Sequence, residues 1–193
     1  MRYPAEQKQR TGARILNAAS SLFRSRGYDA TGIDAIMASA DLTAGAFYSH
    51  FRSKEDLLAQ SLESAFCQSG NAWSKRLSNL RGSDWVRKFA SAYLSKAHRD
   101  NPQQGCPMPA LASEIGRLGG PSRDVFEQRL RGLIDTVGEH LDPDHAIPAV
   151  ALCVGGLMLA RAVDDPKLSD QILSACRAAV VEESAPAQEQ HHV

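Results

Sequence analysis

The sequence lacks the features that mark several classes of protein. Its four cysteines, Cys67, Cys106, Cys153 and Cys176, show neither CxxC spacing nor a histidine at zinc-ligand spacing, so we expect neither a metal site nor a disulfide. The start of the chain has no apolar core of a signal peptide. Cysteines of this kind without a signal peptide are typical of a reducing cytosol, so we expect a cytoplasmic protein.

Net charge is also absent, because 22 Lys and Arg residues balance 22 Asp and Glu residues. This balance excludes a globally basic coat protein for nucleic acid but allows a locally basic segment. Residues 1–28 are such a segment, since their several basic residues outnumber a single acidic one, Glu6. This excess of positive charge indicates contact with an anion. The longest apolar run, residues 146–160, is too short to cross a membrane, so we expect no membrane partner.

Apolar residues recur with helical spacing along almost the whole chain, and almost no segment alternates like a strand. Capping and helix-breaking residues predict helix starts or ends at Gly27, Thr31, Thr43, Ser53, Gly82, Asn101, Pro107, Gly119, Asp142 and Asp165. The predicted fold class is therefore all-α. We expect a helix-turn-helix head over residues 1–53, a helical bundle over 54–181, and a polar, disordered tail over 182–193.

Three short predicted helices with a tight turn over residues 40–42 indicate a helix-turn-helix unit. Such a unit places its second helix in the major groove of DNA. The residues TGIDAI at 31–36, LTAGAFYSHF at 42–51 and SKEDLL at 53–58 resemble the N-terminal signature of the TetR family of bacterial repressors. This resemblance implies a homodimer with an operator-binding head and a C-terminal helical domain that binds a small-molecule inducer.

Several residues of this motif suit contact with DNA. Gly45 allows close approach of the backbone, and Ala44 can meet the methyl group of a thymine. Lys54 begins a helix, where backbone N–H groups also favour an anion such as phosphate. The expected DNA-binding residues are Thr31, Thr43, Ala44, Gly45, Tyr48, Ser49, His50 and Lys54. We expect Phe47 and Phe51 to anchor the recognition helix in the core.

Two residues depart from the pattern of the resembled family. Asp41 stands in the turn, where members commonly have glycine, but aspartate tolerates the left-handed conformation better than most residues. Ala44 stands where a long basic side chain is often found, so residues 43–51 contain no Arg or Lys. Under an alternative interpretation, Tyr48 and His50 pack against the head and do not contact DNA.

Residues 151–162 are apolar almost all round and rich in small side chains, which is typical of a helix buried on all sides. The resemblance places the dimer contact on the last two long helices, and the alternative is a central helix inside one subunit. The resemblance also implies a pocket for a small molecule, and the mixture of aromatics with few interior charges indicates an apolar or aromatic ligand. The candidate ligand-binding or sensor residues are Cys106, Trp73, Phe89, Tyr93, Met108 and Phe126.

Cys106 precedes a proline that opens a short predicted helix, and the N–H groups at a helix start favour a thiolate. The stretch from Gly105 to Glu114 is similar to a subgroup of the family that includes an N-ethylmaleimide-responsive repressor, in which the matching cysteine senses electrophiles. Pro107 and Pro109 depart from that repressor. Cys106 is therefore either an electrophile sensor or a small packing residue.

Together these features predict a dimeric, ligand-responsive transcriptional repressor whose partners are a double-stranded DNA operator and a small-molecule inducer. The alternative is a helical ligand-binding or interaction protein whose head no longer binds DNA, which the lack of Arg and Lys in residues 43–51 favours. The sequence contains no Ser-His-Asp, paired-carboxylate, phosphate-loop or metal-ligand arrangement. We therefore expect neither an enzyme nor a cofactor.

Overall fold

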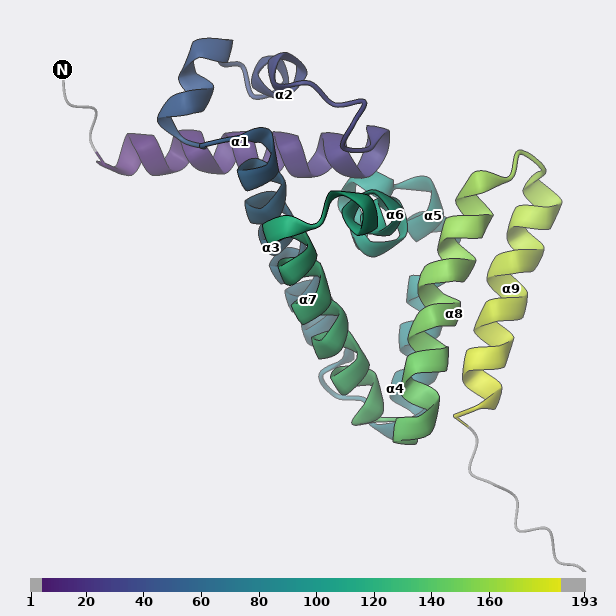
Figure 1. Cartoon of the computed structure of the whole chain (residues 1–193). Coiled ribbons are helices and arrows are strands. Elements are labelled where there is room, and N and C mark those ends of the chain that lie inside the picture. Colours follow the sequence, from purple (N-terminus) through teal and green to yellow (C-terminus); the bar gives the residue numbers. More distant parts are fainter. Residues whose placement is uncertain (1–4, 185–193) are drawn as a thin grey trace, which may run out of the picture. The chain divides into compact units, whose positions relative to one another are not determined.

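The computed structural model describes residues 5–184, and this part of the chain is helical and contains no strand. The predicted all-α fold class is therefore confirmed. Its elements are α1 (Ala5–Arg26), α2 (Ile33–Ser39), the 3₁₀ helix η1 (Ala44–Ser49), α3 (Lys54–Leu77), α4 (Gly82–Tyr93), α5 (Lys96–Asp100), the 3₁₀ helix η2 (Pro102–Gln104), α6 (Met108–Leu118), α7 (Gly120–Gly138), α8 (Pro143–Ala162) and α9 (Pro166–Glu182) (Figure 1).

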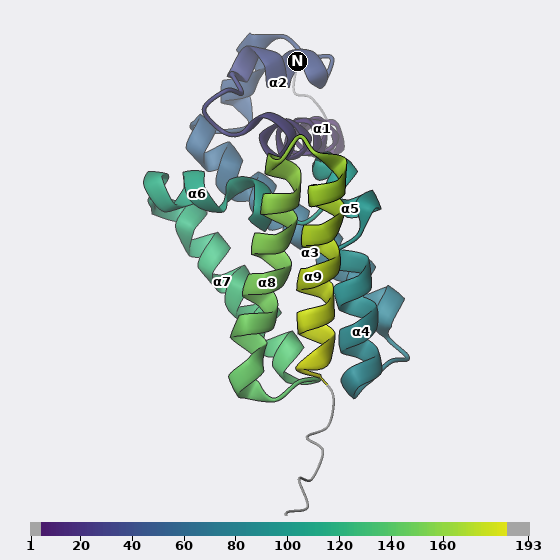
Figure 2. The same cartoon turned by 90° about the vertical axis from the view of Figure 1, so that its right-hand side faces the viewer.

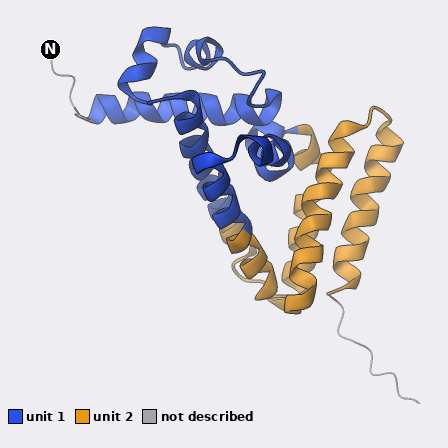
Figure 3. Cartoon of the chain, in the orientation of Figure 1, with its two compact units in different colours: residues 1–72, 101–130 blue, residues 73–100, 131–193 orange. Residues whose placement is uncertain are grey.

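The chain forms two compact units (Figure 3). Unit 1 joins residues 1–72 with residues 101–130, and unit 2 joins residues 73–100 with residues 131–193. Unit 1 thus contains the helix-turn-helix segment and also α6, although α4 and α5 lie between them in the sequence. The predicted boundary at residue 53, between a DNA-binding and a ligand-binding domain, stays a prediction. The predicted disordered tail over 182–193 also stays a prediction, and its residues from 185 onward lie outside the described residues.

The core of unit 1 forms around the apolar stripe of α1. Ile15, Ala19 and Phe23 are fully buried, as the helical spacing predicts, and α1 contacts both α2 and α6. Truncation of one such large side chain costs about 3–5 kcal/mol of stability, because a cavity remains. Gly27 ends α1 with φ +86°, and its N–H donates to the carbonyl of Phe23 at 2.9 Å, so the predicted glycine cap is confirmed.

The predicted cap at Thr31 is wrong, whereas Thr43 occupies its predicted cap position and the cap at Ser53 is confirmed. Gly32 is the N-cap of α2, and the hydroxyl of Thr31 instead donates to the carbonyl of Gly27 at 2.6 Å. Thr43 is the N-cap of η1 but makes no side-chain cap hydrogen bond. The hydroxyl of Ser53 accepts from the N–H of Asp56 at 3.0 Å, as the sequence pattern predicts.

Two predicted helices differ from those in the structure. The recognition helix is a single 3₁₀ segment of six residues. The predicted fifth helix is divided into α4 and α5, since Leu94 has φ −90° and ψ 49° and leaves the helical conformation. The helices that follow begin where proline and capping residues predict: Asp142 accepts from Asp144 N–H, and Asp165 accepts from Lys167 N–H.

Unit 2 is organised by α8 and α9, which lie side by side, with α4 also packed on α9 (Figure 2). Gly156 allows this close packing, because a Cβ at this position would lie 2.7 Å from the sulfur of Cys176. By length and apolar composition alone, α8 could cross a membrane. Core helices share both features, and α8 alone does not indicate a membrane protein.

Candidate DNA-binding site

The turn between α2 and η1 is built around Asp41. Asp41 has φ +51°, a left-handed conformation that glycine adopts most easily but aspartate tolerates. A guanidinium nitrogen of Arg14 on α1 donates to the carbonyl of Ala40 and lies 3.4 Å from Asp41 Oδ2. The turn is therefore formed without glycine, and Arg14 ties it to α1.

The recognition segment η1 is anchored by two aromatic side chains, as predicted. Phe47 is fully buried and Phe51 is 4% exposed, and their ring centroids are 5.8 Å apart. Burial of these rings fixes which residues of η1 face outward. Five of the predicted DNA-binding residues are exposed: Thr43, Ala44, Gly45, Tyr48 and Ser49.

Tyr48 is the most prominent residue of this outward face. Its side chain is 72% exposed, while its ring meets Phe47 edge-on with the centroids 5.1 Å apart. The phenol is thus held at its base and presented to solvent, which favours contact with a partner over packing. The hydroxyl of Ser49 donates to the carbonyl of Ala46 at 2.7 Å, so its oxygen remains an acceptor on the same face.

His50 and Thr31 are less accessible than the other predicted contacts. The ring of His50 lies toward Gly12 of α1, where a Cβ would meet Nδ1 at 3.5 Å. Burial, together with the charge of Lys8, lowers the pKa of His50, so its neutral form predominates at pH 7. Thr31 is fully buried, and its side chain has no surface to offer to DNA, so the prediction of a contact by this side chain is wrong.

Lys54 is the first residue of α3, as predicted for a cation at a helix start. Its ammonium group lies 4.1 Å from the centre of the Tyr28 ring, a cation–π distance. Tyr28 itself packs on Phe23 with ring centroids 5.6 Å apart. Sequence analysis did not predict this support of Lys54, because the two residues are far apart in the chain and belong to different elements.

The six predicted ligand or sensor residues are divided between the two units. Trp73, Phe89 and Tyr93 belong to unit 2, where Trp73 lies 5.6 Å from Phe89 and 6.1 Å from Tyr93 between ring centroids. In unit 1, Cys106 and Met108 are 6% and 1% exposed. Phe126 meets Phe66 at 6.4 Å between ring centroids. The aromatic residues therefore contact one another within each unit.

Cys106 lies just before α6, whose N-cap is Pro107. The neighbouring Gly105 carbonyl accepts a hydrogen bond from Arg24 Nη1 at 2.6 Å. Burial lowers the pKa of Arg24, and the nearby Cys106 thiol opposes this shift. The thiol is thus close to a partly buried cation but has little exposed surface, which favours the packing interpretation in this conformation.

A cavity of about 300 Å³ in unit 2 is lined by residues that were not predicted: Arg99, Asp100, Ala160, Arg161, Val163, Asp164, Pro166 and Ser169.

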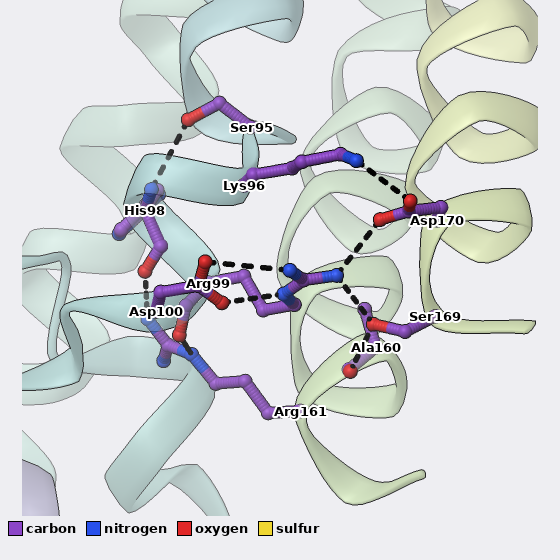
Figure 4. A network of polar contacts seen from close by, with 9 residues as sticks. All are labelled: Ser95, Lys96, His98, Arg99, Asp100, Ala160, Arg161, Ser169 and Asp170. Atoms are coloured by element: carbon purple, nitrogen blue, oxygen red, sulfur yellow. Dashed lines mark hydrogen bonds and ion pairs between the residues drawn. The ribbon is translucent and has the colours of Figure 1, made fainter. Parts of the chain in front are cut away.

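Beside this cavity lies a polar network (Figure 4). Arg99 donates to Asp100 at 2.6 Å, to Asp170 at 2.9 Å and to Ser169 at 2.9 Å. Arg161 donates to the backbone carbonyls of His98 and Arg99. The guanidinium of Arg99 is thus matched by carboxylates of the chain itself, so the network joins α5, α8 and α9.

The helix-turn-helix segment matches a known family model. Residues 15–60 match the model of bacterial regulatory proteins of the tetR family. The transposon Tn10 TetC protein of Escherichia coli is 47% identical over 45 residues, which are 23% of this chain and 23% of TetC. The family model covers the part of the chain that carries the turn and the recognition segment.

Longer similarities extend over most of the chain. The transcriptional repressor NemR of Escherichia coli K12 is 24% identical over 149 residues, covering 74% of this chain and 73% of NemR. The crystal structure of reduced E. coli NemR has a TM-score of 0.78 at 22% identity and covers 92% of this chain and 99% of that one. A TetR regulator from Chloroflexus aurantiacus has a TM-score of 0.78 at 23% identity, over 92% and 95% of the two chains.

The family model, the NemR relative and the solved structures agree with one another. The model covers the residues that form the turn and the recognition segment, and the structures share the helical fold that follows them. Members of this family are transcriptional regulators and not enzymes. Residues 15–60 therefore carry a segment that matches the tetR family of bacterial regulatory proteins, and the described chain shares the fold of solved regulators of that family.

Proposed function

We propose that this chain is a cytoplasmic repressor that binds a palindromic DNA operator as a homodimer and is released by a small-molecule inducer. The observation that carries this proposal is the outward face of η1, which buried Phe47 and Phe51 hold in place while Tyr48 remains 72% exposed. A segment with two buried anchors and small, exposed residues suits insertion into a groove.

The contacts with DNA divide by their chemistry. Lys54, Tyr48 and Thr43 carry donors that suit phosphate oxygens, and such contacts position the head without reading sequence. Ala44 and Gly45 are exposed and suit close apolar contact with base edges, including thymine methyl groups. Ser49 adds a hydroxyl to this face. His50 is half-buried, so we assign it a supporting position at the edge of the contact.

Dimerisation is supported by apolar side chains that unit 2 leaves exposed. On α8, Ile147, Met158 and Leu159 are 62%, 43% and 53% exposed, and Leu168 at the start of α9 is 43% exposed. Large exposed apolar patches often mark sites of protein–protein contact, and we propose that these side chains belong to one such site. A second copy that covers this surface would bring two heads to one operator, as a two-fold symmetric site requires.

We assign inducer binding to the aromatic residues of unit 2. Trp73, Phe89 and Tyr93 form a mutually packed cluster, which suits a flat apolar ligand that separates the rings. Release by an electrophile at Cys106 is the finer alternative, and the 6% exposure of this residue means that a modifying molecule must first open its surroundings.

The proposal is tested by measuring binding of the purified chain to duplex DNA at low and high salt, together with its sedimentation. We expect a dimer at micromolar concentration and affinity that falls steeply with salt, because phosphate contacts release counterions. A chain that stays monomeric, or that ignores both DNA and heparin at low salt, would establish the alternative of a helical ligand-binding or interaction protein. The absence of Arg and Lys from residues 43–51 is the observation that favours this alternative.

A further inference from the structure

The loop that follows α1 is held by a carboxylate from α6. Both oxygens of Glu114 accept the N–H of Tyr28, at 2.9 and 3.1 Å, and Oε1 also accepts the N–H of Asp29 at 3.3 Å. Successive backbone N–H groups that converge in this way form an anion-binding concavity. Hydrogen bonds to a charged acceptor are about twice as strong as neutral ones, so the loop has a strong anchor on α6.

Gly27 makes this close approach possible. Its φ of +86° directs the following N–H groups toward α6, and a Cβ at this position would lie 3.0 Å from Glu114 Oε1. Gly27 therefore ends α1 and also leaves space for the Glu114 carboxylate. The contact belongs to the loop between α1 and α2, which is part of the DNA-binding head.

Tyr28 connects this anchor to the proposed phosphate contact. Its backbone is held by Glu114, and its ring lies beneath the Lys54 ammonium at 4.1 Å. A ring fixed in this place restricts the positions of the lysine side chain, which otherwise has many rotamers. Displacement of α6 would therefore move the ring on which Lys54 rests.

α6 is hydrogen-bonded to α1 just before it begins and lies close to the start of α3 where it ends. Before the helix, the carbonyl of Gly105 accepts from Arg24 of α1 at 2.6 Å. After it, a Cβ at Gly120 would collide with the carboxylate of Glu55, the residue next to Lys54. These contacts explain why residues 101–130 belong to the same compact unit as the helix-turn-helix segment.

We propose that Glu114 is a positioning residue for DNA binding, which acts through Tyr28 to place Lys54 against a phosphate. The proposal rests on the proposed function, because it assumes that Lys54 contacts DNA.

The test is a double-mutant cycle on DNA affinity with Glu114→Gln and Lys54→Ala. We expect Glu114→Gln to weaken binding about tenfold, within the usual range of coupling between sites, although removal of a negative charge alone would strengthen it. With Lys54→Ala already present, the same change should have almost no effect, because residues that act through one another are not additive. An equal loss in both backgrounds would overturn the proposal.

Two controls separate positioning from general damage. Asp124→Asn removes the same charge from an exposed position of unit 1 and should leave affinity unchanged. Tyr28→Phe keeps the ring and should bind like the wild type, whereas Tyr28→Leu should reproduce the loss seen with Glu114→Gln. Equal affinities of the Phe and Leu variants would contradict a role for the ring.

A measurement without DNA keeps this inference distinct from the proposed function. In the NMR spectrum, the Lys54 side-chain methylene protons should be shifted by the Tyr28 ring, and the Tyr28 amide should exchange slowly. Both signatures should be lost in Glu114→Gln. Unchanged signatures would overturn the proposal, whereas wild-type protein that shows both signatures but binds no DNA would overturn only the proposed function.

Discussion

At the scale of single residues, the recognition segment is unusual for what it lacks. Residues 43–51 contain no Arg or Lys, and the exposed residues of η1 are small or aromatic. Under the proposed function, readout of bases would depend on apolar contacts and on the shape of the DNA, with the cationic contacts at neighbouring positions such as Lys54. A hydrogen-bond donor introduced on this face should therefore change the DNA sequence that the head prefers.

Ala44→Arg should change the preferred DNA sequence, because an arginine at an exposed groove-facing position can donate two hydrogen bonds to a guanine. We expect discrimination of about 1–3 kcal/mol in favour of guanine at one position of each half-site. Selection of binding sites from a random library measures this, with Arg52→Lys as a charge-conserving control outside η1. Unchanged preference would mean that position 44 does not face the base edges.

The cysteines differ in accessibility, and this difference gives a second prediction at the residue scale. Cys67 is exposed and Cys106 is buried, so a brief exposure to a maleimide should label Cys67 first in the folded protein. Mass spectrometry of proteolytic peptides locates the label, and a Cys67→Ser variant shows whether labelling of this residue affects DNA binding. Rapid labelling of Cys106 in the native protein would contradict the packing interpretation and support an electrophile sensor.

At the scale of elements, the turn of the helix-turn-helix depends on a side chain from α1. Asp41 occupies a left-handed conformation that costs about 1 kcal/mol for residues other than glycine. The exposed Arg14–Asp41 ion pair contributes less than this, since surface pairs are worth about 0–1 kcal/mol. Arg14 contributes mainly by its hydrogen bond to the carbonyl of Ala40, which any residue at position 41 would leave intact.

We therefore expect Asp41→Gly to raise the free energy of unfolding by up to about 1 kcal/mol, and Arg14→Ala to lower it. Denaturant titration of the two variants and of their combination measures both effects. If Asp41→Gly destabilised the protein, the ion pair would have to outweigh the backbone conformation, contrary to this account.

The network that joins α5, α8 and α9 should fail in acid. Hydrogen bonds from Lys96 and Arg99 hold the pKa of Asp170 below its usual value. Because the folded-state pKa is the lower one, this stabilisation is fully present above the ordinary pKa of aspartate, near 4, and is lost as the pH falls through the lowered value.

Asp170→Asn should therefore lower the Tm at pH 7, and the difference from the wild type should shrink as the pH falls below about 4. Asp84→Asn is the matched control, because Asp84 forms only an exposed pair with Arg87 within α4. A Tm difference for Asp170→Asn that stayed constant down to pH 3 would show that the charge of Asp170 is not its source.

Sequence analysis predicted the elements well where the signals are local. The apolar spacing of α1 and the prolines that open α8 and α9 depend only on nearby residues, and the structure confirms them. Contacts across long separations were not predictable: Tyr28 and Glu114 are 86 residues apart, and Arg24 and Gly105 are 81 apart. Thr31 shows the same limit, since its hydroxyl satisfies the end of α1 and not the start of α2.

At the scale of the whole molecule, the proposed function places two heads on one operator. A single head offers one recognition segment of six residues, so we expect specific binding to need a second copy. The exposed apolar side chains of α8 and α9, among them Ile147 and Leu159, are the surface on which that copy would lie. Glu114 then matters for the molecule as a whole, because it links α6 to the head in each copy.

The most direct test of this account is selection of DNA sites from a random duplex library by the full chain. The account predicts enrichment of an inverted repeat whose half-sites are separated by about one helical turn, about 34–36 Å, or somewhat more. It also predicts that each selected site binds two copies of the chain. Enrichment of no sequence, or of a single half-site bound by one copy, would contradict it.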